Sequence, residues 1–133
     1  MSIKKFPLEA HGAAVSRAEL VQAALDEITQ NYREASLSNV ARSYGVSLAY
    51  VSECVRAQTG KTYKELLQKH RMETAARLLR RSDLNIQQII AQVGYENTSY
   101  FYRLFHERYG LSPREYPVSY THLRAHETEA DLV

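Results

Sequence analysis

The fold is decided by residues 83–116, which read DLNIQQIIAQVGYENTSYFYRLFHERYGLSPREY. Isoleucines recur at helical spacing from Ile86, Gly94 and the polar Asn97 interrupt this pattern, and aromatic residues resume it from Phe101. Apolar residues spaced by three and four positions predict helices, and a glycine favours a left-handed helix end. The stretch therefore predicts a short helix, a tight turn and a second helix, which is the helix-turn-helix layout.

The same pattern occurs a second time, about fifty residues earlier in the chain. Before the turn, the apolar and glycine positions of the two copies match at an offset of 49: Leu37, Val40 and Gly45 with Ile86, Ile89 and Gly94. After the turn the offset is 50: Val51, Val55 and Gly60 with Phe101, Phe105 and Gly110. The extra residue falls in the turn, and the repeat predicts two helix-turn-helix units.

Several helix starts are marked by a capping residue three positions before a Glu or Gln. These pairs are Ser16 with Glu19, Thr62 with Glu65, Asn85 with Gln88, and Ser112 with Glu115. In such a pair each side chain accepts a hydrogen bond from a backbone N–H that the helix itself leaves unsatisfied. Pro113 adds the residue that is favoured at the first helical position.

Glycine and proline are few, and no stretch alternates with period two, so the predicted class is all-α. We expect two helix-turn-helix subdomains joined by a long linker helix, with about seven helices. The expected helices are 16–31, 36–45, 47–59, 62–80, 86–93, 98–109 and a short one after Ser112. The expected domains are 1–15 as a leader or linker remnant, 16–61 and 82–116 as the subdomains, 62–81 as the linker helix, and 117–133 as a non-native tail.

Helical spacing also predicts which residues form the core. We expect inward positions at Val21, Leu25, Ile28, Tyr32, Leu37, Val40, Ala41, Leu48, Val51, Cys54, Val55, Leu66, Leu67, Ala75, Leu78, Leu79, Phe101, Leu104 and Phe105. Cys54 is the only cysteine, so it is interpreted as a small core residue rather than a reactive thiol.

Charge is distributed unevenly along the 133 residues, although the net charge is only +2. Residues 1–35 carry −1, residues 36–116 carry +5 and residues 117–133 carry −2. A basic middle segment suits a phosphate backbone, and it would also suit a solvated helical surface. The single cysteine, together with the lack of a signal sequence or a long apolar run, predicts a cytoplasmic protein without a membrane partner.

Residues 36–116 resemble the C-terminal domain of the AraC/XylS family of transcription activators, and residues 83–116 resemble that family's signature. The resemblance implies two helix-turn-helix units bridged by one helix, usually attached to a ligand-binding or dimerisation domain. Ile90 stands where the family usually has alanine and Val55 where it usually has phenylalanine. Those two differences change packing volume in opposite directions.

A recognition helix places short polar groups and cations against base edges in a major groove about 12 Å wide. The outward positions of the two predicted recognition helices are Ala49, Tyr50, Ser52, Glu53 and Arg56, and Thr98, Ser99, Tyr102, Arg103 and His106. Arg103 matches a base-contacting position of the family and is our candidate for bidentate readout of guanine. Glu53 holds the equivalent place, where it either accepts from cytosine or orients Arg56.

Other side chains are candidates for phosphate contacts, with simple solvation as the alternative for each. The cations in this group are Lys61, Lys64, Arg80, Arg81 and Arg108. The hydroxyls of Tyr50, Tyr100 and Tyr102 would reach phosphates if these rings are not used for packing. Arg71 lies in the linker helix and is expected to pair with Glu65 or Glu73.

Nothing in the sequence predicts catalysis, a cofactor or a metal site. His70 and His106 are isolated on predicted helices, and His122 and His126 lie in the tail. The predicted partner is a double-stranded DNA operator bound by a monomer, with RNA polymerase as a further candidate. The alternative is a helical protein-interaction module without sequence preference for DNA. An enzyme fragment related to DNA-repair proteins would bring a cysteine cluster that this chain lacks.

Overall fold

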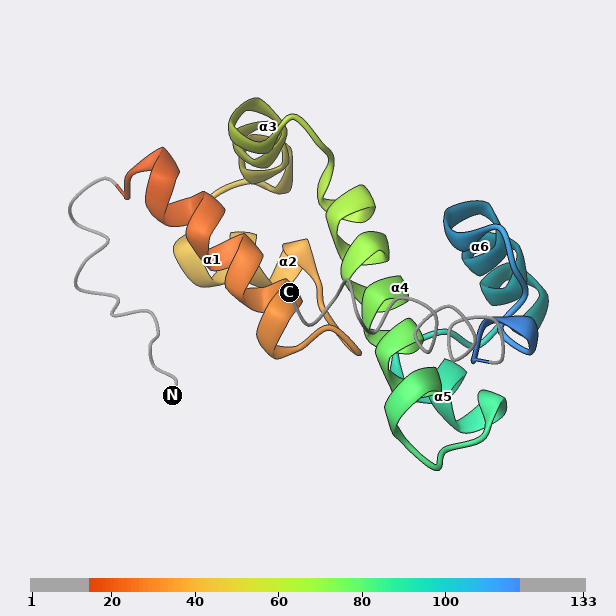
Figure 1. The fold of residues 1–133 in the computed structure, drawn as a ribbon. Helices are drawn as coiled ribbons and strands as arrows, with labels where there is room; N and C mark the ends of the chain where they lie inside the picture. The colour runs from red at the N-terminus through yellow and green to blue at the C-terminus, as the bar shows by residue number, and fades with distance from the viewer. Residues whose placement is uncertain (1–14, 118–133) are drawn as a thin grey trace, which may run out of the picture. The chain divides into compact units, whose positions relative to one another are not determined.

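The computed structural model describes residues 15–117, and all regular secondary structure in that range is helical (Figure 1). The helices are α1 (Arg17–Gln30), α2 (Leu37–Tyr44), α3 (Leu48–Thr59), α4 (Tyr63–Arg81), α5 (Ile86–Gln92) and α6 (Thr98–Tyr109). A seventh, short helical segment occupies 115–117. The all-α class is thus confirmed. The expected leader, 1–15, and tail, 117–133, lie outside the described residues except at their inner ends.

The helix starts form as the capping pairs predict. At Ser16, Thr62, Asn85 and Ser112 the side chain accepts from the backbone N–H three residues later, and the Glu or Gln there accepts from the backbone N–H of the cap. The eight donor-to-acceptor distances run from 2.8 to 3.2 Å. The Thr62 backbone N–H, by donating to Glu65, lowers the pKa of that carboxyl.

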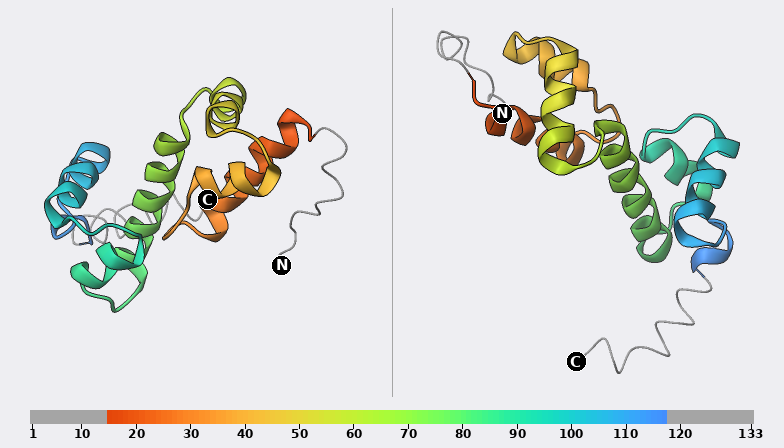
Figure 2. Two further views of the ribbon diagram at one scale, coloured as in Figure 1. Left: turned by 180° about the vertical axis from the view of Figure 1, so that it is seen from behind. Right: turned by 90° about the horizontal axis from the view of Figure 1, so that it is seen from above.

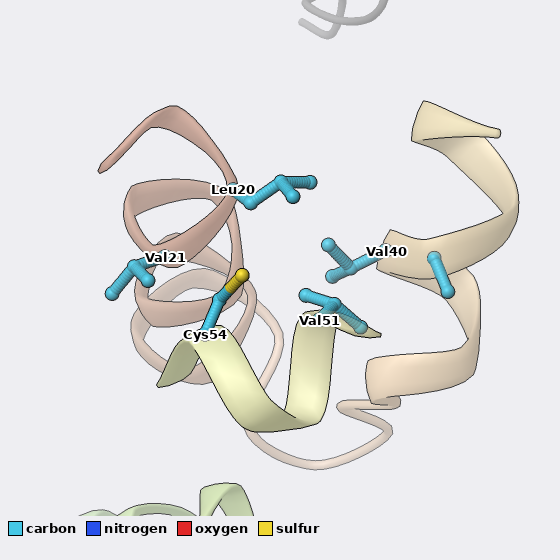
Figure 3. Packing of buried hydrophobic residues seen from close by; sticks show 6 residues of the cluster. Leu20, Val21, Val40, Val51 and Cys54 are labelled. Atoms are coloured by element: carbon cyan, nitrogen blue, oxygen red, sulfur yellow. The ribbon is translucent and has the colours of Figure 1, made fainter. Parts of the chain in front are cut away.

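The described residues fall into two compact units, one through His70 and one from Arg71. In the first unit, α1, α2 and α3 pack around a cluster of buried side chains (Figure 3). Its members are Leu20, Val21, Val40, Ala41, Val51 and Cys54. A second cluster, Ala24, Ile28, Val55 and Tyr63, joins the start of α4 to α1 and α3. The Cys54 side chain is fully buried, as expected of a core residue.

The second unit contains the rest of α4, together with α5, α6 and the short segment at 115–117, and α5 and α6 lie beside that part of α4 in both views of Figure 2. Its buried apolar side chains are Met72, Ala75, Ala76, Ile89, Ile90, Val93, Phe101, Phe105 and Pro113. The Tyr109 hydroxyl donates to the carbonyl of Met72 at 3.4 Å. Arg80 donates to the Tyr116 hydroxyl at 3.2 Å, so the end of α6 and the segment at 115–117 are both bonded to α4.

The turns of the two helix-turn-helix units have the same backbone geometry. Gly45 and Gly94 both have left-handed conformations, with φ of 66° and 98°. One residue later, the Val46 N–H donates to the carbonyl of Ala41, and the Tyr95 N–H donates to the carbonyl of Ile90, both at 3.0 Å. A bond across six residues at a left-handed helix end is the Schellman motif. The predicted repeat is therefore present at the level of individual hydrogen bonds.

Some expected core positions differ from the structure. Leu48 was expected to point inward but is 49% exposed, because it is the first residue of α3 and precedes the part of that helix covered by α1 and α2. On α1 the buried stripe includes Leu20 and Ala24, whereas Leu25 is only half-buried. On α4 the sequence reasoning omitted four buried side chains, which are Tyr63, Met72, Thr74 and Ala76.

The turn glycine Gly45 allows a test of backbone strain alone. A Cβ added to Gly45 would meet nothing within 4 Å, so replacement affects conformation and not packing. We expect Gly45→Ala to lower the free energy of unfolding by about 1 kcal/mol, because φ of 66° is unfavourable for a side chain. Gly45→Asn should lower it less, since asparagine tolerates this conformation. Urea unfolding measures both, and an alanine variant as stable as the parent would contradict the strain argument.

Candidate nucleic-acid interface

Helix α3 is held by its buried side and leaves its other side in solvent. Its start is capped by Ser47, whose Oγ accepts from the Tyr50 N–H at 3.0 Å. Val51, Cys54 and Val55 are fully buried. The predicted reading positions of this helix are all exposed: Ala49, Tyr50, Ser52, Glu53 and Arg56. The structure therefore brings this predicted set together on one continuous surface.

Helix α6 is arranged in the same way. The Asn97 side-chain oxygen accepts from the Tyr100 N–H at 2.8 Å, and Phe101 and Phe105 are fully buried. Of the predicted reading positions, the exposed ones are Ser99, Arg103 and His106, and the half-buried ones are Thr98 and Tyr102. The Tyr102 ring packs edge-on against Phe101, with centroids 6.3 Å apart. Tyr102 thus has a packing role beside any contact through its hydroxyl.

Arg103 belongs to a chain of stacked groups. Its guanidinium carbon lies 5.0 Å from the ring centroid of Tyr100. Tyr100 is edge-on to Tyr95 at 6.0 Å, and the guanidinium of Arg71 lies 5.1 Å from the Tyr95 ring. Burial raises the pKa of the Tyr95 hydroxyl. A cation over an aromatic ring is attracted by the ring's negative face, so the chain restricts where the Arg103 side chain can point.

Arg71 and the α1 residue Arg17 have contacts that the sequence reasoning did not find. Arg71 was expected to pair with Glu65 or Glu73 on its own helix, and its guanidinium is found over Tyr95. The Arg17 guanidinium carbon lies 5.7 Å from the ring centroid of Tyr50. Both contacts join residues far apart in the sequence, and no periodic pattern encodes such pairs. Arg17 also lies outside the repeat that drew attention to the two recognition helices.

The predicted phosphate contacts differ in how available they are. Four of the five cations are exposed, namely Lys61, Lys64, Arg81 and Arg108. Arg80 is half-buried and bonded to Tyr116, so its guanidinium is partly committed within its own unit.

Within residues 15–117, no helix is long and apolar enough to cross a membrane. In the same range, no three His, Cys, Asp or Glu side chains are grouped so that they could hold a metal ion.

The sequence and fold of this chain are similar to those of known transcription regulators. The family model described as a helix-turn-helix domain matches residues 40–117. The transcriptional activator PerA of Escherichia coli O127:H6 is 33% identical over 93 residues, which cover 68% of this chain and 31% of PerA. The transcriptional activator NphR of a Rhodococcus species is 35% identical over 91 residues, 67% of this chain and 27% of NphR. The chain thus spans about a third or less of these curated relatives.

Among solved structures, the C-terminal domain of AraT, a response regulator of Geobacillus stearothermophilus, has a TM-score of 0.70 at 33% identity. That match covers 75% of this chain and 84% of the other. The two capped, half-buried helices and these likenesses define a DNA-binding helix-turn-helix domain of transcription regulators. Within that class, the chain belongs to the AraC/XylS family.

Proposed function

We propose that the chain binds one face of double-stranded DNA as a monomer, with α3 and α6 entering successive major grooves about 34 Å apart. The observation that carries the proposal is the matched exposure of α3 and α6, each anchored by its buried side in a helix-turn-helix. A helix with side chains is about 10–12 Å across, which suits a major groove of about 12 Å. Binding to DNA, without catalysis, is then the activity of this domain.

Arg103 is the residue that we assign to base readout. Its position in the first half of α6 and its stacking on Tyr100 support this role, because a guanidinium held in place loses less entropy when it bonds to guanine. The exposed side chains around it, Ser99 and His106, would lie beside the same groove. Arg56, in the second half of α3, is assigned to a phosphate.

The two reading surfaces differ, so the operator should be asymmetric. Glu53 on α3 holds the position that Arg103 holds on α6. A carboxylate accepts hydrogen bonds from cytosine, whereas a guanidinium donates to guanine.

The domain of the global transcriptional factor AdpA was solved with a target DNA, and its fold matches at a TM-score of 0.67 with 23% identity, over 84% of this chain and 96% of that one. This likeness in fold supports DNA as the partner. PerA and NphR are transcriptional activators, so we propose that this chain also serves transcription activation. We propose the cytoplasm as its location and RNA polymerase as a candidate second partner.

Salt dependence tests the proposal most directly. If the chain neutralises six to ten phosphates, its affinity should fall by about three to five decades between 50 and 200 mM salt. A labelled duplex recovered from a randomised library would be titrated at several salt concentrations. An affinity that does not change with salt would exclude DNA binding through the exposed lysine and arginine side chains.

Paired arginine variants separate base readout from phosphate contact. Arg103→Ala should cost roughly 1–3 kcal/mol on the selected duplex and relax preference at one or two base pairs. Arg56→Ala should weaken all sequences similarly and lower the salt slope by about one. Competition binding with single-base variants of the duplex measures both effects. Equal loss on every sequence for both variants would refute readout by Arg103 while leaving DNA binding intact.

The spacing of the half-sites tests whether both units engage DNA. Helix α4 is uninterrupted from Tyr63 to Arg81 and belongs to both units, so we propose that it sets a fixed spacing. Inserting five base pairs turns one groove by about half a helical turn, so only one unit could then bind in register. We expect affinity to fall toward that of a random duplex, with a ten-pair insertion as the control for length alone. An unchanged affinity would mean that one unit binds alone.

A further inference from the structure

The first unit carries an arginine at the edge of its reading surface that belongs to neither helix of the helix-turn-helix. Arg17 is the first residue of α1 and is exposed. Its guanidinium carbon lies 5.7 Å from the ring centroid of Tyr50, the third residue of α3. The Tyr50 side chain is itself 40% exposed, so the stacked pair shares the solvent-facing surface of α3.

The core fixes this end of α1 against α3. Leu20 and Val21 follow Arg17 by one helical turn, and they are buried in the same cluster as Val51 and Cys54 (Figure 3). Val51 is the residue after Tyr50. The contact between Arg17 and the recognition helix is therefore supported by packing one turn away on α1, and it does not depend on the arginine alone.

The repeat gives this contact a counterpart in the second unit. Tyr50 and Tyr100 are equivalent residues, and each donates its backbone N–H to the cap of its recognition helix. The cation over Tyr100 is Arg103, from the same helix. In the first unit the position of Arg103 is taken by Glu53, and the cation over the tyrosine comes from α1 instead. Each recognition helix thus has an arginine over its equivalent tyrosine.

Arg17 does not contribute to the stability of α1 through its charge. The N-terminus of a helix carries partial positive charge, so a cation at the first helical position is unfavourable there. Departures from a local rule are expected where a residue serves function. Tyr50 offsets part of this repulsion by stacking.

We propose that Arg17 contacts a DNA phosphate beside the first half-site and supplies a positive charge next to Tyr50, on the unit where Glu53 takes the place of Arg103. This inference rests on the proposed function. A phosphate, and not a base, is the target because Arg17 lies on α1 and not on the helix that enters the groove, and elements beside a recognition helix contact the DNA backbone. Tyr50 is the positioning residue that holds the guanidinium at this edge.

Salt titrations of four proteins test the proposal: the parent chain, Arg17→Ala, Arg17→Lys and Arg33→Ala. Arg33 is a matched control, because it is an exposed arginine of the same unit just beyond the other end of α1, about 20 Å away for a helix of 14 residues. The probes are the duplex selected from the randomised library and a random duplex of equal length. Thermal unfolding checks that the variants keep the stability of the parent.

We expect Arg17→Ala to lower the salt slope by about 0.9 and the affinity at 100 mM salt roughly eightfold, on both duplexes alike. Arg17→Lys should restore most of the slope, because it keeps the charge, and Arg33→Ala should leave the slope unchanged. An unchanged slope for Arg17→Ala, or an equal decrease for Arg33→Ala, would overturn the contact. Relaxed preference at single base pairs in Arg17→Ala would overturn the assignment to a phosphate.

Arg103→Ala, measured in parallel, separates this inference from the function on which it rests. If Arg103→Ala relaxes base preference while Arg17→Ala changes nothing, only the Arg17 contact is wrong. If the affinity of the parent chain for DNA does not change with salt concentration, the proposed function itself is wrong.

Discussion

The burial of one side of each recognition helix is the constraint on which the rest of the structure depends. A helix of twelve residues such as α3 has little stability alone, so it forms because Val51, Cys54 and Val55 are removed from water against neighbouring helices. The same packing determines which residues stay outside. Because the period of a helix is fixed, the choice of buried side also selects the reading surface. The helical period therefore determines both the core residues and the residues that remain exposed on each recognition helix.

Features that depend on a few neighbouring residues could be predicted from the sequence. The four capping pairs formed as expected because each involves residues three apart, whose relation a helix start fixes completely. The two turns were predictable for the same reason, since Gly45 and Gly94 end their helices in conformations that other residues resist. The exposed positions on α3 followed from the spacing of its buried valines.

Features that depend on neighbouring helices could not be predicted. The spacing of α3 assigns Leu48 to the apolar stripe with Val51, but nothing in that spacing says that the first residue of the helix is left exposed. The contact of Arg17 with Tyr50 and that of Arg71 with Tyr95 have the same origin, because each joins a helix to a residue of another structural element. Periodicity gives the face that a residue lies on, but not what lies opposite that face. These contacts became visible only once the helices were placed.

The two units reach a similar arrangement of charge by different means, and this difference bears on how the domain distinguishes one orientation of its site from the other. In the second unit the cation sits on α6 itself and is braced by Tyr100, Tyr95 and Arg71. In the first unit α3 presents Glu53 at the equivalent position, and the cation over Tyr50 comes from α1. A carboxylate beside a phosphate backbone is repelled unless a base donor or a cation compensates it. Under the proposed readout, binding in the reversed orientation would set Glu53 against the half-site that suits Arg103, so the two orientations would differ in affinity.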